Sequence, residues 1–236
     1  MKIGKHIKTD TGSSDLTQWS EIMDPIMKDM VDIGIRVAKL RAATLVIPSK
    51  KDTFRALELT PPDQLKVILV GQDPYPKYGQ PTGVAFGVDL EKSKTVPFSL
   101  KIILEEVENT TDVLQLTPDH SLESWCKQGV LMLNTALTLE AGKIGSHTEM
   151  WKPFMERFLE DVTTKYPDVP VIFLGAKAAA FEKHLKGNPV IKASHPAAEA
   201  YGRRGGFLKS GVFNKCNEVL QEQGKTPIQW SLQELL

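Results

Sequence analysis

Apolar residues recur along the chain with two different periods, and these periods separate helices from strands. Spacings of three and four positions are typical of amphipathic helices, whereas short continuous apolar runs rich in β-branched residues are typical of buried strands. Four such runs occur, at residues 66–70, 130–133, 169–174 and 189–193. Helical spacing covers residues 19–45, with a joint near Pro25, and further helices are predicted at 52–59, 97–109, 121–128, 151–165, 176–185 and 210–221.

Strands and helices alternate in this pattern, which predicts an α/β fold. Right-handed crossovers between successive strands produce a parallel sheet with helices on both faces. We therefore expect a central four-stranded parallel sheet within a single domain over residues 1–236, because no linker, repeat or low-complexity tract divides the chain. Residues 1–14 are polar and are predicted to be loose, and the tail that reaches Trp230 is predicted to dock on the body.

The composition narrows the range of partners. Lysine plus arginine equals aspartate plus glutamate, at 29 each, so a polyanion has to be bound by a local patch of charge. Cys126 and Cys216 are far apart and lack metal-ligand spacing, which predicts no disulfide and no metal site and fits a reducing compartment. No apolar run approaches the length of a membrane span, about 18 residues. We expect no membrane contact, no cofactor, a monomer and a cytoplasmic location, or a nuclear or viral-replication compartment if the source is eukaryotic or viral.

Three of the four predicted strands lead into a polar side chain suited to catalysis. These side chains are Asp73, Asn134 and His195. Each also has a structural explanation, since aspartate and asparagine are common in turns and a histidine before proline is often structural. In parallel α/β sheets, however, ligands bind outside the carboxyl ends of the strands. A carboxylate, an amide and an imidazole that converge there can polarise a bond, read a planar polar ligand and stabilise a developing anion.

Motifs over residues 60–232 resemble those of the uracil-DNA glycosylases of the family 1 type. The matching segments, in chain order, are Gly71-Gln-Asp-Pro-Tyr75, Gly83-Val-Ala-Phe86, Val96-Pro-Phe-Ser99, the segment 122–135 that contains Asn134, His195-Pro196 and Thr226-Pro-Ile-Gln-Trp230. The resemblance implies hydrolysis of the N-glycosidic bond of a flipped-out deoxyuridine in single- or double-stranded DNA, which releases uracil and leaves an abasic site.

The resemblance also implies a role for each site residue. Asp73 activates water and supports an oxocarbenium-like sugar, and His195 donates a hydrogen bond to uracil O2 as the base leaves. Asn134 pairs with uracil O4 and N3, which selects against cytosine. The remaining base contacts are implied for the backbone of Gln72, for Tyr75, which excludes the methyl group of thymine, and for Phe86, which stacks on the ring.

Contacts to the DNA backbone are predicted less directly. By resemblance Ser99 belongs to a loop that contacts the DNA backbone, and the cationic residues near the catalytic loops are the candidates for a basic patch. These cations are Lys77, Arg203, Arg204 and Lys209. A solvated charge cluster is the alternative explanation for them.

Two departures resemble the poxvirus-type branch of the family. Pro76 replaces the usual histidine, and the loop reads His195-Pro-Ala-Ala-Glu-Ala200, so Glu199 stands where a duplex-invading leucine is expected. A carboxylate is unsuited to that task because DNA is a polyanion. Either Tyr201 stacks in its place, or the enzyme works without a wedge and prefers bases that flip at lower cost.

Two other functions are compatible with parts of this pattern. In the first, the chain is a DNA-binding replication accessory that keeps the glycosylase fold and has reduced activity. A protein inhibitor or a replication partner is a candidate ligand in either case. In the second, the edge of the sheet binds a nucleotide for a transferase reaction, but the sequence lacks a Gly-rich phosphate motif such as GxxxxGK[ST].

Overall fold

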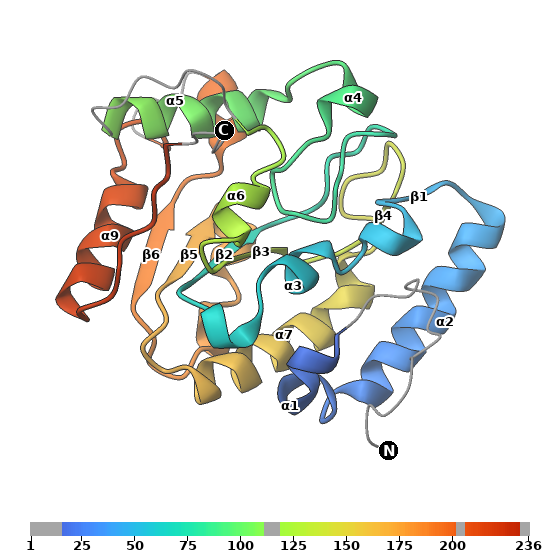
Figure 1. Cartoon of the computed structure of the whole chain (residues 1–236). Coiled ribbons are helices and arrows are strands. Elements are labelled where there is room, and N and C mark those ends of the chain that lie inside the picture. Colours follow the sequence, from blue (N-terminus) through green and yellow to red (C-terminus); the bar gives the residue numbers. More distant parts are fainter. Residues whose placement is uncertain (1–15, 111–118, 202–205, 232–236) are drawn as a thin grey trace.

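The computed structural model describes residues 16–110, 119–201 and 206–231, which form an α/β structure around one parallel sheet (Figure 1). The sheet contains β2 (Val67–Gly71), β3 (Val130–Asn134), β5 (Val171–Leu174) and β6 (Val190–Ala193), in the order β3-β2-β5-β6. All three strand pairs are parallel. The predicted four-stranded parallel sheet is confirmed.

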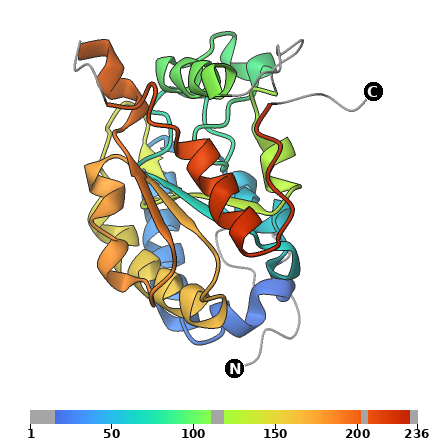
Figure 2. The ribbon, with the colours of Figure 1, turned by 90° about the vertical axis from the view of Figure 1, so that its left-hand side faces the viewer.

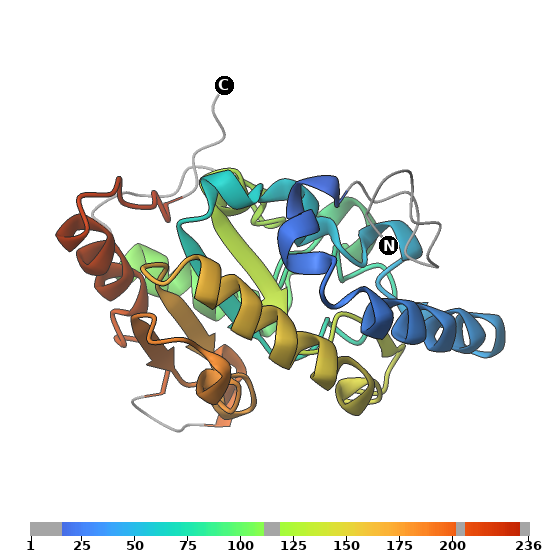
Figure 3. The ribbon, with the colours of Figure 1, turned by 90° about the horizontal axis from the view of Figure 1, so that it is seen from below.

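Alternate side chains of the strands point to opposite faces of the sheet, and each face has its own core. Ile68 and Val70 of β2 pack in one cluster with α1 (Ser20–Met23), α2 (Met27–Ala43) and α7 (Thr148–Lys165). Val67 and Leu69 pack in the other cluster with α5 (Phe98–Thr110), α6 (Glu123–Cys126) and α9 (Val212–Glu222). Figure 3 shows α7 beside α1 and α2, and Figure 2 shows α9 on the other side of the sheet.

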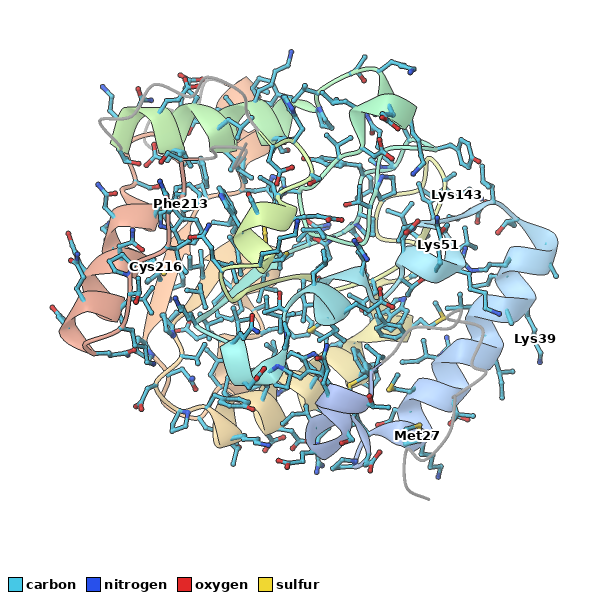
Figure 4. All side chains as sticks on the ribbon, viewed as in Figure 1. Met27, Lys39, Lys51, Lys143, Phe213 and Cys216 are labelled. Carbon is cyan, nitrogen blue, oxygen red and sulfur yellow. The ribbon has the colours of Figure 1, made fainter. Side chains whose placement is uncertain are left out.

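The second cluster contains the C-terminal elements and both cysteines. Phe213 and Cys216 point from α9 toward the sheet (Figure 4) and are fully buried. Burial raises the pKa of the Cys126 and Cys216 thiols to about 12. Trp230 is buried as predicted, and its carbonyl accepts a hydrogen bond from Trp125 Nε1 at 3.1 Å. The tail therefore closes the core on this face.

The helices follow their predicted positions in part, and one predicted helix is divided. The joint near Pro25 is confirmed, because η1 (Thr17–Trp19) and α1 end before α2 begins at Met27. The predicted helix 176–185 is wrong as one element: it divides into α8 (Ala176–Ala179) and η4 (Glu182–His184). The backbone tightens where Phe181 N–H bonds to Ala178 O, and this turn buries the Phe181 ring in the core.

Several short elements carry too little periodicity to be predicted. The pair β1 (Val46–Ile47) and β4 (Leu139–Glu140) forms a separate antiparallel sheet. The other unpredicted elements are η3 (Pro62–Gln64), α4 (Leu90–Ser93) and η5 (Pro196–Tyr201). The helix predicted at 52–59 is present as α3 (Arg55–Leu59), preceded by η2 (Lys50–Asp52). In the described part of the chain, no helix is both long and apolar enough to cross a membrane.

Candidate active site

The register of the sheet brings the three predicted polar residues to one edge. Gly71 at the end of β2 is paired with Asn134 at the end of β3, and Asp73 follows two residues later. His195 follows β6 in the same way. Beyond the strands, Thr135 N–H donates to Gly71 O at 3.0 Å, and Thr135 Oγ1 donates to Gln72 O at 2.9 Å. These bonds fix the start of the loop that carries Asp73.

The absence of a side chain at two glycines allows the site to close. A Cβ atom added at Gly175 would lie 2.9 Å from the Cβ of His195. One added at Gly71 would lie 2.5 Å from Asn134 Oδ1 and 2.9 Å from Phe86 Cε2. All three distances are shorter than a Cβ atom tolerates, so glycine is required at both positions for these residues to pack as they do.

Asp73 is a half-buried carboxylate with one oxygen committed and one available. Its Oδ2 accepts a hydrogen bond from Gln72 Nε2 at 2.6 Å, whereas its buried Oδ1 has no partner among the described residues. Burial raises the pKa of Asp73, and the Gln72 amide, the Lys177 ammonium and the backbone N–H of Gly145 act in the opposite direction. A buried carboxylate oxygen without a protein partner can accept a hydrogen bond from water or a substrate.

His195 is held as a neutral ring with a defined tautomer. Its Nδ1 accepts a hydrogen bond from the backbone N–H of Ala197 at 3.1 Å, which places the ring proton on Nε2. Burial lowers the pKa of His195, which favours the neutral form. The ring is tilted by 50° against Phe86, with 5.7 Å between the ring centroids. His195 is thus arranged as a neutral hydrogen-bond donor through Nε2.

A cavity of about 250 Å³ opens beside these two residues. It is lined by Gln72, Asp73, Pro74, Tyr75, Pro76, Phe86, Ser99, Ile144, His195 and Ala197. Asn134 lines a second cavity of about 10 Å³, which shares Pro74, Tyr75 and Phe86 with the first. Tyr75 and Phe86 therefore border both cavities, whereas Asn134 lines the smaller one only.

The walls of the cavity are fixed by backbone contacts. Tyr75 Oη donates to Phe86 O at 3.1 Å, and Ala85 N–H donates to Met132 O at 3.1 Å. Phe86 itself has a φ of +63°, a left-handed conformation that is rare for an aromatic residue. Such a strained conformation persists only where the surroundings impose it, and it is concentrated at functional sites. The Phe86 ring is thus presented in one orientation.

The predicted DNA contacts are only partly described. Ser99 lies near the start of α5 and lines the cavity, and Lys77 is exposed in the loop that follows Asp73. Tyr201 ends η5, but its side chain lies outside the described residues, as do Arg203 and Arg204. The roles predicted for these residues remain predictions.

Glu199 turns out to organise the loop instead of facing a ligand. Its Oε1 accepts from Phe207 N–H at 2.6 Å and from Leu208 N–H at 3.0 Å, and these bonds lower the pKa of Glu199. The fully buried Glu106 continues the pattern, because it accepts from Lys209 N–H at 2.6 Å and from Gly211 N–H at 2.8 Å. Two carboxylates therefore hold the segment that closes the His195 loop.

Two residues near the site were missed by the sequence analysis. Lys177, two residues after Gly175, is exposed and close enough to lower the pKa of Asp73. The rule that strand ends carry function points to this position, since Lys177 follows β5. Ile144 lines the cavity, and no local pattern in the sequence identifies it.

Comparisons with known proteins agree with the geometry. A family model described as the Uracil DNA glycosylase superfamily matches residues 57–221. Uracil-DNA glycosylase 1 of Listeria innocua is 34% identical over 225 residues, covering 91% of this chain and 97% of the relative. A uracil-DNA glycosylase of Coxiella burnetii is 37% identical over 217 residues, covering 90% and 92%. A variant of mimivirus UNG, solved in complex with UGI, superposes with a TM-score of 0.80 at 26% identity, covering 91% of this chain and 88% of that one.

Proposed function

We propose that this chain, which belongs to the uracil DNA glycosylase superfamily, removes uracil from DNA by hydrolysis of the N-glycosidic bond, with Asp73 and His195 as its catalytic residues. The products are free uracil and an abasic site. The observation that carries the proposal is the convergence of Asp73, His195 and Asn134 around adjoining cavities at the carboxyl edge of the sheet.

The two catalytic residues act on opposite charges in the transition state. As the glycosidic bond breaks, negative charge develops on the uracil and positive charge on the sugar. The Nε2–H of neutral His195 stabilises the charge on uracil O2, and the Asp73 carboxylate stabilises the sugar and orients the attacking water. Because both groups are partly desolvated, their interaction with these charges is stronger than it would be in water.

Base selection is assigned to the inner wall of the site. The side-chain amide of Asn134 lines the smaller cavity, where it can pair with O4 and N3 of uracil. Cytosine presents the opposite donor pattern at its amino group and would leave buried polar groups unpaired. Tyr75 fills the space that the methyl group of thymine needs. Tyr75→Ala is therefore expected to admit thymine, and Asn134→Asp to admit cytosine.

The depth of the site requires the nucleotide to leave the base stack. A base paired within a duplex cannot reach Asp73, which is half-buried, or Asn134, which is buried. We therefore assign base flipping to this enzyme. A uracil that is already unpaired reaches the site at lower energetic cost.

The test is release of uracil from a uracil-containing oligonucleotide, in an assay without added metal and with a chelator present. Asp73→Asn and His195→Ala are each expected to lower kcat/KM by about a hundredfold or more, the usual effect of removing one preorganised electrostatic contact. Asp63→Asn and His120→Ala serve as matched controls, because neither residue lines the site. Activity close to that of the wild type in both site variants would refute the assignment.

We also propose further properties of the enzyme. The intact set of Asp73, Asn134 and His195 favours an enzyme over a replication accessory with reduced activity. A mimivirus UNG variant was solved in complex with UGI, which supports binding of a similar protein inhibitor here and can be tested by inhibition of uracil release. A monomer and a cytoplasmic location are also proposed, to be tested by analytical ultracentrifugation and by cell fractionation.

A further inference from the structure

Ile144 is an apolar side chain that the fold leaves at the mouth of the active site. It lines the 250 Å³ cavity together with Asp73 and His195, yet it is 64% exposed. Core packing therefore does not explain its position. Ligand sites are lined largely by apolar side chains with a few polar groups, so this placement makes Ile144 a candidate ligand contact.

The turn that carries Ile144 is held rigidly against the catalytic loop. Gly142 N–H donates to Pro76 O at 2.8 Å, and Ser146 N–H donates to Lys143 O at 3.2 Å. The backbone N–H of Gly145 is also close enough to Asp73 to lower the pKa of its carboxyl group. Ile144 is thus presented at a fixed place relative to the reacting bond.

The usual position of a duplex-invading side chain is not available in this chain. The carboxylate of Glu199 is bound to the backbone of Phe207 and Leu208, and a carboxylate is repelled by the DNA backbone. Proteins that unstack a base step commonly insert an apolar wedge such as Phe, Leu, Ile or Met. Of these types, Ile144 is the one that lines the described cavity and is strongly exposed.

We propose that Ile144 packs against the base stack of duplex DNA beside the extruded deoxyuridine and stabilises the flipped state. The inference rests on the proposed function and specifies how that site treats a paired substrate. Lys143, labelled in Figure 4, precedes Ile144 on the same turn. Its Nζ pairs with Glu140 Oε1 at 2.6 Å, and its largely exposed side chain can approach a phosphate as the turn meets the duplex. A single-stranded substrate has no stack to be opened, so it does not need this contact.

The experiment compares uracil release by Ile144→Ala from single-stranded DNA and from a duplex with a U·A pair. We expect kcat/KM on the duplex to fall by about tenfold, with little change on the single strand, because only the duplex requires unstacking. Ile144→Leu should retain duplex activity, and Ile144→Asp should lose more of it than Ile144→Ala. Ile35→Ala is the matched control, since Ile35 is 51% exposed on α2, which contributes no residue to the cavity.

A second readout does not depend on turnover. With 2-aminopurine next to a non-cleavable deoxyuridine analogue in a duplex, the wild type should raise the fluorescence as the stack opens, and Ile144→Ala should raise it less. Equal losses on both substrates, or unchanged kcat/KM and fluorescence, would overturn the inference while leaving the proposed function intact. A wild-type protein that releases uracil from neither substrate would overturn both.

Discussion

Gly71→Ala tests whether the position of the Asn134 amide controls catalysis. Gly71 lies in β2, and its φ is not among the positive values found for nine other glycines, so the backbone accepts alanine. The added Cβ would lie 2.5 Å from Asn134 Oδ1 and 2.9 Å from Phe86 Cε2. The substitution thus perturbs the base-reading wall without removing any functional group.

The size of the effect follows from these distances. An ordinary van der Waals contact of this kind begins at 3.4 Å, so the amide oxygen has to retreat by 3.4 − 2.5 = 0.9 Å. A misplacement of roughly 1 Å in an active site can lower the rate by about a hundredfold. The protein should nevertheless stay folded. An overpacked methyl group costs about 1–3 kcal/mol of folding stability, which lowers the Tm of a chain of this length by several degrees.

The assay is uracil release from a single-stranded oligonucleotide, with a thermal melt of each protein. Val70→Ala is the matched control: it alters the neighbouring residue of the same strand, whose side chain packs on the α2 and α7 face. The control is expected to lose stability but to keep kcat/KM. If Gly71→Ala is folded and keeps kcat/KM within about threefold of the wild type, activity does not depend on the position of the Asn134 amide. That result would contradict the base-reading role proposed for Asn134.

Three further substitutions separate charge from structure. Burial raises the pKa of Asp73, so folding stability falls as pH rises from the unfolded pKa of this group through its folded pKa. Asp73→Asn should therefore raise Tm at pH 7. In a pH series of melts, this gain in Tm should vanish below the unfolded pKa. Lys177→Gln should move the acid limb of kcat/KM to higher pH, because Lys177 lowers the pKa of Asp73, whereas the Lys183→Gln control should not. Either orientation of the amide in Glu106→Gln places an NH₂ against a backbone N–H, which should cost about 1–3 kcal/mol in denaturant unfolding; an unchanged midpoint would contradict this account.

The sheet and its catalytic edge could be predicted because they depend on signals that are local in the sequence. A parallel strand buried on both faces is a continuous apolar run, and its carboxyl end is the residue where that run stops. The position of Asn134 therefore follows directly from the end of its apolar run. Asp73 and His195 come two residues after their strands, so they lie at the same edge if the loop stays close to it. The pairing of Gly71 with Asn134 confirms that the ends of β2 and β3 are level.

The parts that could not be predicted depend on contacts between distant segments. The strands β1 and β4 have two residues each, too few to show a period, and their pairing joins Val46 to Glu140 across the chain. The exposure of Ile144 arises from the path of a turn that is bonded to Pro76, a residue far away in sequence. The sequence shows that Glu199 is a poor wedge, but only the loop conformation shows that its carboxylate bonds to Phe207 N–H.

The loop that begins at His195 shows why the wedge position can be used for another purpose. Catalysis requires the imidazole to stay in one place, and backbone hydrogen bonds to Glu199 and Glu106 hold the far end of the loop at residues 207–211. A leucine in place of Glu199 supplies no acceptor for these N–H groups, so the apolar contact with DNA would be gained at the expense of loop order. Both requirements are met if Glu199 orders the loop and Ile144, on the turn at residues 142–146, contacts the duplex. Activity on unpaired uracil then depends on the loop alone, and activity on paired uracil depends on both segments.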